Sequence, residues 1–292
     1  MSLDEYLADR GRLVEEWLAA WVERARPDVE PRLLEAMAYS LLSGGKRIRP
    51  VLLLAAGESV GAPAPLLPFA CAVEMIHTYS LIHDDLPSMD DDPMRRGKPS
   101  NHVVFGDGVA TLAGDALLTE AFAVMSGAGA PADVTLRSVL ELATAAGAAG
   151  MVGGQTADLL AVGTGADRAR VESIHRRKTG ALLRASIRIG ALVARAHEDS
   201  LDRLSRYGES LGLAFQIADD LLDEAGNLAA TGKESPRDRE RGKSTYPGAL
   251  GVQECRAILR RLLADTLGAI EPLGSRAEPL RAIARSLIAR AL

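Results

Sequence analysis

The sequence predicts an all-α fold. Most of the chain consists of Ala- and Leu-rich segments in which apolar residues recur at helical spacing, with few runs of β-branched residues. The alternating apolar and polar pattern of a half-buried strand does not persist anywhere along the chain. Clusters of Gly and Pro separate the helical segments, as expected where helices end.

The expected helices can be followed in order from the N-terminus. Segment 3–25 places Trp17 and Trp21 one turn apart, which is typical of a core or subunit interface, and segment 31–43 repeats the pattern. The other helical segments are 108–126, 133–160, 168–197, 199–224, 248–268 and 276–291. Breaker segments lie at 61–68, 126–133 and 163–167. The charged stretch 225–247 is expected to be a long loop or lid, and long loops in compact domains are often functional.

Composition and charge restrict the class of protein. The chain has 292 residues and a formal net charge of −5, which argues against a general nucleic-acid binder. Its two cysteines, Cys71 and Cys255, provide neither a disulfide framework nor a zinc-binding spacing, so we expect a reduced, cytoplasmic setting. The charged N-terminus does not resemble a signal peptide, and no run reaches the roughly 18 apolar residues of a membrane span. We therefore expect one domain over residues 1–292 without stable membrane insertion.

Two clusters of aspartates carry the strongest functional signal. Asp84-Asp85 with Asp90–Asp92, and Asp219-Asp220 with Asp223, each follow an apolar run directly. Massed carboxylates beside apolar sequence are costly unless a cation neutralises them. Mg²⁺ suits such sites, because it takes oxygen ligands and is usually held by one or two carboxylates together with substrate phosphates.

The two clusters have different spacings. Asp219 and Asp223 are four residues apart, which places both carboxylates on one face of a helix. A solvated acidic face is the alternative, and the apolar FQIA before it disfavours that alternative. Asp84 and Asp90 are six apart, about 240° around a straight helix. Pro87 is expected to break the helix and bring Asp90 back near Asp84.

Basic and glycine-rich segments accompany the acids. Arg95 and Arg96 follow the first cluster, and GGKRIRP at 44–50 combines a backbone that can approach an anion with three basic side chains. All five lysines of the chain lie in Gly- or Pro-punctuated polar segments, where a compact ammonium suits phosphate better than a guanidinium does. A P-loop is excluded, because the glycine that it requires is replaced by Arg237 or Asn227.

Five motifs, taken in order, are similar to those of the polyprenyl diphosphate synthases, and most of all to their short-chain bacterial farnesyl diphosphate synthase members. These motifs are GGKRIRP, MIHTYSLIHDDLPSMDDDPMRRGKP, GGQTAD, HRRKTG, and FQIADDLLDEAGN with the GKES and GKSTYP that follow it. The resemblance covers roughly residues 35–250. It implies the all-α isoprenoid synthase helical bundle around a central cavity, a homodimer, and the condensation of isopentenyl diphosphate with an allylic diphosphate.

The resemblance also implies roles for single residues. The direct Mg²⁺ ligands would be Asp84, Asp90 and Asp219, with Asp85 and Asp223 acting through water or from behind the ligands. Three Mg²⁺ ions are expected, with Mn²⁺ as a substitute, and the allylic diphosphate would also contact Arg95, Lys178, Lys233 and Lys243. Isopentenyl diphosphate would lie on Gly45, Lys46, Arg49, His77 and Arg96. The catalytic residues would be Lys178, which also holds the diphosphate, and Thr179, Gln216 and Gln155, which would line the region where the carbocation forms. His83 is expected to be structural.

Product length is expected to depend on Tyr79, which lies five residues and about 7–8 Å before Asp84 on the same helix. In the family that is resembled, the hydrocarbon tail grows along this helix. An aromatic ring at this position would limit the product to farnesyl diphosphate, while Ser80 beside it is too small to block the tail. The alternatives are a geranylgeranyl diphosphate synthase on the same scaffold, a terpene cyclase, or a non-catalytic regulatory subunit. Cyclases lack the second aspartate motif and GGKRIRP, and both are present in this chain, which argues against a cyclase. Regulatory subunits typically lose aspartates, whereas all the expected aspartates are present here.

Overall fold

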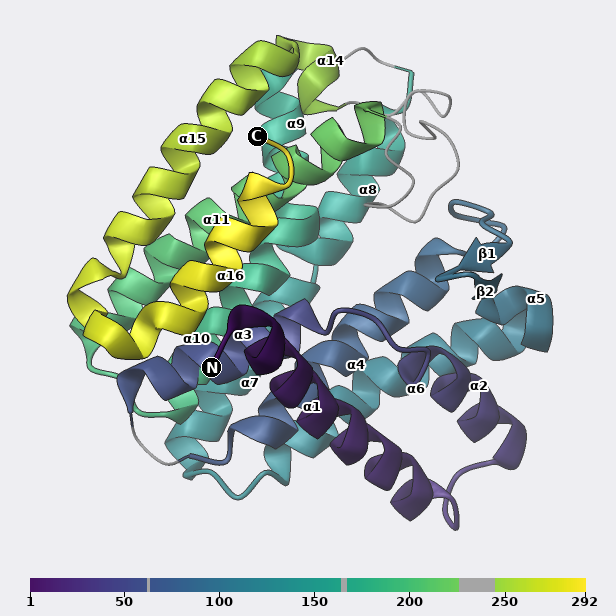
Figure 1. Cartoon of the computed structure of the whole chain (residues 1–292). Coiled ribbons are helices and arrows are strands. Elements are labelled where there is room, and N and C mark those ends of the chain that lie inside the picture. Colours follow the sequence, from purple (N-terminus) through teal and green to yellow (C-terminus); the bar gives the residue numbers. More distant parts are fainter. Residues whose placement is uncertain (62–63, 164–166, 226–244) are drawn as a thin grey trace. The chain divides into compact units, whose positions relative to one another are not determined.

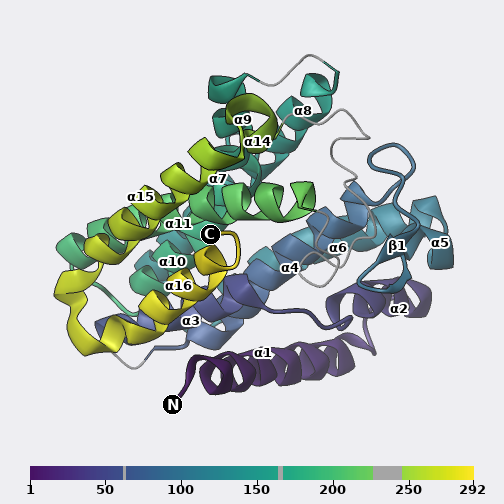
Figure 2. The same ribbon diagram turned by 45° about the horizontal axis from the view of Figure 1, so that its top comes forward.

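The computed structural model describes residues 1–61, 64–163, 167–225 and 245–292. The chain divides into two compact units (Figures 1 and 2). Unit 1 comprises Met1–Leu54 and Ala64–Val139, and unit 2 comprises Ala55–Pro63 and Leu140–Leu292. We describe each unit by itself, and the expectation of a single domain remains a prediction.

Unit 1 is built around helix α4. Its elements are α1 (Leu3–Ala25), α2 (Pro31–Leu41), the first part of α3 (Ile48–Val60), α4 (Leu66–Asp84), β1 (Met94–Arg95), β2 (Lys98–Pro99), α5 (Asn101–Phe105), α6 (Asp107–Ser126) and the first part of α7 (Ala132–Ala146). Helix α4 packs against α1, α2 and α6, and every residue from Phe69 to Ile76 is buried. A helix that is buried around its whole circumference must be apolar on all sides, as this run is apart from Glu74.

Unit 2 is built around helix α11. Its elements are the last parts of α3 and α7, then α8 (Met151–Ala161), α9 (Arg168–His175), a π-helical turn (Arg176–Gly180), α10 (Ala181–Val193), α11 (Glu198–Glu224), α14 (Tyr246–Leu250), α15 (Val252–Ala269), a 3-10 segment (Glu271–Ala277) and α16 (Glu278–Ala289). Helix α11 packs against α10, α15 and α16. The fully buried Tyr207 of α11 donates its hydroxyl to the carbonyl oxygen of Leu280 in α16 at 2.8 Å, which satisfies the polar end of a core side chain.

The all-α prediction is confirmed, and the departures from the expected helices have local causes. The expected helix 133–160 is divided into α7 and α8. At Gly150, between the two, a Cβ atom would lie 2.0 Å from the carbonyl oxygen of Ala145, so this close backbone approach requires glycine. The expected helix 168–197 contains the π-helical turn, and the described strands are the two-residue pair β1 and β2, which are antiparallel.

Helix α6 is long and apolar enough, by length and composition alone, to cross a membrane. A core helix of a soluble protein meets the same criterion. One side of α6 is buried in unit 1 through Ala113, Leu117 and Ala121, and the helix packs against α4. The criterion therefore carries little weight for this helix.

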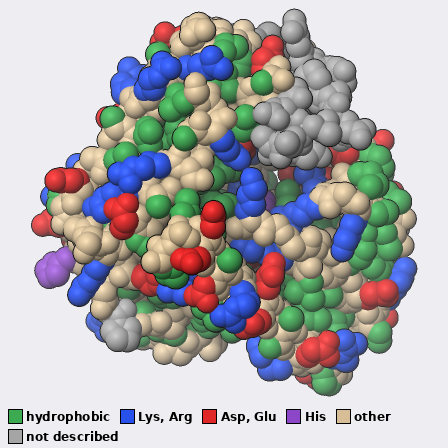
Figure 3. Space-filling model, in the orientation of Figure 1, with side chains coloured by type: hydrophobic (Ala, Val, Ile, Leu, Met, Phe, Trp, Pro, Cys, Tyr) green, Lys and Arg blue, Asp and Glu red, His purple; other side chains and the backbone are tan. Residues whose placement is uncertain are grey.

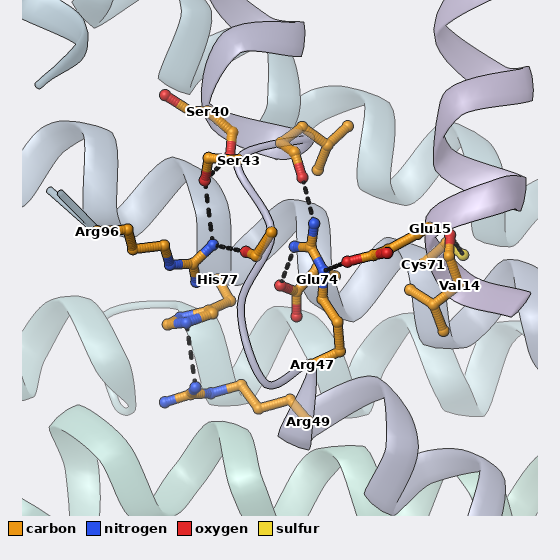
Figure 4. A network of polar contacts seen from close by, with 12 residues as sticks. Val14, Glu15, Ser40, Ser43, Arg47, Arg49, Cys71, Glu74, His77 and Arg96 are labelled. Atoms are coloured by element: carbon orange, nitrogen blue, oxygen red, sulfur yellow. Dashed lines mark hydrogen bonds and ion pairs between the residues drawn. The ribbon is translucent and has the colours of Figure 1, made fainter. Parts of the chain in front are cut away.

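A buried ion pair attaches the loop before α3 to α4 (Figure 4). Arg47 donates from Nη1 to Oε1 of Glu74 at 2.6 Å and from Nη2 to the carbonyl oxygen of Leu41 at 2.8 Å. The two side chains are only 1% and 2% exposed, so neither charge is stabilised by water. Arg47 also has a φ of 47°, a left-handed conformation that is uncommon for residues other than glycine. The ion pair therefore holds the loop in a conformation that the backbone alone disfavours.

We predict that Glu74→Gln lowers the free energy of unfolding by up to roughly 3–5 kcal/mol, because it removes the closest carboxylate from the buried Arg47 guanidinium. The carboxylate of Glu15, 3.6 Å from Nε of Arg47, is half exposed and compensates the buried charge less well. The double variant Arg47→Met/Glu74→Leu removes both charges and should lose much less. Urea unfolding of the two variants and the parent protein measures both values. A Glu74→Gln protein as stable as the parent would contradict a stabilising role for the pair.

Candidate functional site

The first aspartate cluster lies where α4 ends. Helix α4 stops at Asp84, Pro87 follows in a turn, and the backbone N–H of Asp90 donates to the carbonyl oxygen of Asp84 at 2.9 Å. A second bond, from the N–H of Asp92 to the carbonyl oxygen of Asp85 at 3.2 Å, fixes the same return of the chain. The predicted break is thus confirmed, and it brings the backbones of Asp84 and Asp90 together.

The buried Asp85 and the partly exposed Arg95 form an ion pair beside this turn. The Nε of Arg95 donates to both carboxylate oxygens of Asp85, at 3.1 and 3.2 Å, and its Nη2 also donates to Oδ1. Burial raises the pKa of Asp85, although Arg95 acts in the opposite direction. Asp85 is therefore positioned to orient the turn and Arg95, and its indirect role at a metal site stays a prediction.

The GGKRIRP loop brings basic side chains next to α4 at Glu74 and His77 (Figure 4). Gly44 and Gly45 have φ values of 77° and 124°, a region that side chains rarely adopt. Nη1 of Arg96 donates to Oγ of Ser43 at 3.2 Å and to the carbonyl oxygen of Gly44, and a Cβ atom on Gly45 would meet the Arg96 guanidinium at 2.9 Å. The open backbone at Gly45 therefore allows the contact with Arg96.

Arg49 and His77 are brought together in the same region. Nη1 of Arg49 lies 3.2 Å from Nε2 of His77, and a guanidinium can only donate, so Nε2 accepts and the ring proton is on Nδ1. Burial first, and the Arg49 charge next, hold the pKa of His77 well below its usual range. A neutral His77 thus orients Arg49, while Lys46 is exposed on the loop.

The residues expected to set product length lie on α4 between His77 and Asp84. Tyr79 is 5% exposed, and its ring makes an edge-to-face contact with His83, with ring centroids 5.7 Å apart. Burial, together with the Asp84 charge, raises the pKa of Tyr79 to about 12, so its hydroxyl stays protonated. Ser80 donates its hydroxyl to the carbonyl oxygen of His77 at 2.9 Å.

The second aspartate cluster lies in the last two turns of α11, in unit 2. The helix runs without interruption to Glu224, so the expected shared face of Asp219 and Asp223 is confirmed at the level of the backbone. Nη2 of Arg290, which follows α16, lies 2.5 Å from Oδ1 of Asp219, and its guanidinium lies 5.3 Å from the ring centroid of Phe215. Arg290 thus contacts a side chain expected to bind metal.

Asp220 is the buried member of this cluster and has a different role. Its Oδ2 accepts the backbone N–H of Tyr246 at 2.9 Å, and its Oδ1 accepts Nε2 of Gln216 at 3.2 Å. Oε1 of Gln216 in turn accepts the hydroxyl of Thr179 at 2.8 Å. Two of the expected catalytic side chains, Thr179 and Gln216, are thus joined and anchored through Asp220.

The π-helical turn presents Lys178. Nζ of Lys178 lies 2.7 Å from Oδ2 of Asp158 on α8. A Cβ atom on Gly154 would lie 2.3 Å from the backbone nitrogen of Lys178, so this glycine allows α8 to approach the turn closely. On α8, Oε1 of Gln155 is buried without a hydrogen-bond partner among the described residues. π-helical turns often occur at functional sites.

The donor chemistry fits Mg²⁺ recruited together with a phosphate. Both clusters provide carboxylate oxygens at the C-terminal ends of helices, where the helix dipole adds further negative potential. Within the described ranges, no three Asp, Glu, His or Cys side chains converge as a ready-made metal cage. Mg²⁺ is commonly bound by one or two carboxylates with phosphate oxygens completing its shell. The carboxylates of Asp84 and Asp90 in unit 1, and separately that of Asp219 in unit 2, are oxygen donors of the kind that such a site uses.

The structure adds residues that the motifs did not indicate. Two of them contact expected site residues directly: Asp158 contacts Lys178, and Arg290 contacts Asp219. The other two act one step away, since Glu74 holds Arg47 in the GGKRIRP loop and His175 lies beside Asp220. Glu74 had a signal in the sequence, because it is a lone acid within the apolar run that precedes the first cluster. The expected ligands Lys233 and Lys243, and nearly all of the expected lid, lie outside the described residues.

We predict that His175 makes the stability of the protein depend on pH. Burial lowers its pKa to about 4, against the opposing effect of Asp158, whereas the unfolded chain takes up the proton near pH 6.5. The free energy of unfolding should therefore fall as the pH drops from 6.5 towards 4. The fall should be steeper in the parent than in His175→Gln, by about 1.4 kcal/mol per pH unit. Urea unfolding across this range measures the difference. His197→Gln, at an exposed histidine, is the matched control, and equal pH profiles for His175→Gln and the parent would refute the prediction.

Comparison with known proteins assigns the chain to a family. The family model described as polyprenyl synthetase matches residues 30–274. A farnesyl diphosphate synthase of Geobacillus stearothermophilus is 47% identical over 256 residues, covering 86% of this chain and 86% of that protein. A geranylgeranyl diphosphate synthase of Cyanophora paradoxa is 42% identical over 293 residues, covering 99% and 97%. The crystal structure of an FPP/GFPP synthase from Zymomonas mobilis matches with a TM-score of 0.88 and 36% identity over 98% of each chain. The chain belongs to the polyprenyl synthetase family.

Proposed function

We propose that this protein is a short-chain prenyltransferase that joins isopentenyl diphosphate head-to-tail to dimethylallyl or geranyl diphosphate and releases farnesyl diphosphate. The observation that carries the proposal is the pair of acidic helix ends, at Asp84 and at Asp219, in a chain that also assembles Arg49, His77 and Arg96 around a glycine loop. Relatives named for this activity match the chain over most of its length.

Unit 1 supplies the proposed site for isopentenyl diphosphate. Lys46 and Arg49 lie on the GGKRIRP segment, and Arg96 contacts its glycine backbone, so three cations gather at one loop. Such a cluster of positive charge suits a diphosphate. The neutral His77 holds the Arg49 fork in one orientation, which suits recognition of a phosphate by two parallel N–H groups. The Arg47–Glu74 pair fixes the loop that carries these groups.

The allylic diphosphate is proposed to bind through metal ions and basic side chains. Asp84, Asp90 and Asp219 would hold the ions, with Asp85 and Asp223 supporting them, and Arg95, Lys178, Lys233 and Lys243 would contact the phosphate. Mg²⁺ would supply charge neutralisation that makes diphosphate a better leaving group. Lys178 and Arg95 are held by Asp158 and Asp85, so their charges are in place before substrate arrives.

Loss of diphosphate leaves an allylic cation, which the double bond of isopentenyl diphosphate attacks. Thr179, Gln216 and Gln155 are proposed to surround this cation with oxygen atoms, and Gln155 Oε1 is a buried acceptor without a described partner. The departing diphosphate is proposed as the base that removes the final proton. Water must be excluded, since it would quench the cation. Cys71 takes no part, because burial raises the pKa of its thiol and keeps it protonated.

We also propose a cytoplasmic homodimer. Large apolar side chains are exposed on α5, α6 and α7 of unit 1, including Val103, Leu112 and Leu136 at 53%, 59% and 69%. Figure 3 shows hydrophobic side chains gathered on the surface over α5. A second copy of the chain is the proposed cover for this surface, since exposed apolar patches commonly mark protein–protein contacts.

A direct assay tests the proposal. The purified protein, incubated with isopentenyl and geranyl diphosphates, should release diphosphate and form a fifteen-carbon product with Mg²⁺, and do neither with a chelator present. Asp84→Asn should lose at least about 100-fold in rate, the scale of removing one strong transition-state contact. Asp91→Asn, in the same cluster but exposed, is the matched control. Absence of diphosphate release would refute the enzyme, and release without elongation would favour the cyclase.

Product length separates the farnesyl from the geranylgeranyl alternative. We predict that Tyr79→Ala shifts the main product from fifteen to twenty or more carbons, because it removes a buried ring from the helix along which the tail is proposed to grow. Chromatography of the dephosphorylated products measures this shift. An unchanged fifteen-carbon product would remove Tyr79 as the limit, and a twenty-carbon product from the unaltered protein would favour the geranylgeranyl alternative.

A further inference from the structure

His83 lies one helical turn after Tyr79 on α4, so the two side chains are neighbours on the same face. Their rings meet edge to face, with centroids 5.7 Å apart and an interplanar angle of 74°. This is a favoured geometry for aromatic pairs. The orientation of the buried Tyr79 ring therefore depends in part on where the ring of His83 is held.

A contact with helix α6 holds His83 in place. Nε2 of His83 lies 3.0 Å from the backbone carbonyl oxygen of Thr111. Because a carbonyl can only accept, Nε2 carries the proton and donates it. The carboxylate of Asp115, also on α6, lies 3.8 Å from the same nitrogen. His83 is thus tied to the backbone of the helix that packs against α4.

The approach of His83 to α6 requires a glycine. A Cβ atom built on Gly114 would lie 2.1 Å from Nε2 and 2.5 Å from Cδ2 of His83, far inside van der Waals contact. Gly114 lies in the middle of α6, where glycine is less favourable than alanine by about 1 kcal/mol. Room for the His83 ring is a physical reason for a glycine at this position.

We infer that His83 and Gly114 together determine product length, by fixing the ring of Tyr79 in the position that limits the growing chain. His83 acts here as a positioning residue, through Tyr79, and not as a group that touches the reacting atoms. The inference rests on the proposed prenyltransferase function and deepens it. It extends the determinant of product length from one residue of α4 to a contact between α4 and α6, namely Gly114–His83–Tyr79.

The first test is the product distribution of His83 variants. His83→Ala frees one side of the Tyr79 ring, and we expect the ratio of twenty- to fifteen-carbon product to rise at least about 10-fold, the factor that corresponds to about 1.4 kcal/mol. His83→Phe keeps a ring against Tyr79 and should retain mainly the fifteen-carbon product. A parent-like product from His83→Ala would overturn the inference, as would equal shifts in both variants.

The second test uses Gly114. Gly114→Ala should displace His83 and raise the share of twenty-carbon product, whereas Gly108→Ala on the same helix, where no atom lies within 4 Å of the added Cβ, should leave the product unchanged. In a His83→Ala background the clash is gone, so adding Gly114→Ala should not change product length further. It should raise the melting temperature slightly, because alanine is more favourable than glycine inside a helix. Additive effects of the two substitutions on product length would contradict the shared contact.

The two levels of failure can be told apart. If the unaltered protein releases no diphosphate and forms no elongated product, the proposed function itself is wrong. If it forms farnesyl diphosphate and every His83 and Gly114 variant does the same, the function stands and the inference about α6 falls. Melting temperatures of all variants show that each product was formed by a folded protein.

Discussion

Negative charge at the C-terminal ends of two buried helices is the constraint on which the rest of the structure depends. Helix α4 ends at Asp84 and helix α11 ends one residue after Asp223, where the helix dipole already makes the potential negative. Carboxylates there are stabilised only by opposite charge or by hydrogen-bond donors. The chain supplies some of these itself, through Arg95 on Asp85, Arg290 on Asp219 and the backbone N–H of Tyr246 on Asp220. The proposed metal ions would add positive charge at both helix ends.

Helix α4 packs against other elements on all of its sides, so side chains on each of its faces contact a neighbour. It can therefore combine several functions. Glu74 fixes the glycine loop, His77 orients Arg49, and Tyr79 packs on His83 below the acidic end. Successive turns of one helix thus lead from the loop attachment to the proposed phosphate site, the proposed limit on chain length and the proposed metal ligands. A rigid helix keeps these distances constant, which suits a reaction that requires a cation and a double bond to be held in register.

Local sequence was enough to predict most helices and the arrangement of the aspartates. Pro87 indicated the break after Asp84, and the four-residue spacing of Asp219 and Asp223 indicated one helical face. The division of 133–160 was missed because it depends on close backbone packing at Gly150, and helical spacing continues through it. The pairs Arg47–Glu74 and Asp219–Arg290 join residues 27 and 71 positions apart, and no local spacing encodes such contacts. The anchoring of Thr179 through Gln216 to Asp220 was hidden for the same reason.

Binding of an unreactive substrate analogue tests most directly the proposal that the allylic diphosphate binds through both Asp84 and Asp219. In geranyl thiodiphosphate, sulfur replaces the oxygen whose bond to carbon is broken. Calorimetric titration of this analogue with Mg²⁺ present should show tight binding to the parent protein, and strongly weakened binding to both Asp84→Asn and Asp219→Asn. Binding to the parent should also weaken strongly when the metal is removed. An analogue that binds either variant as tightly as the parent, or that binds equally well without metal, would contradict the account.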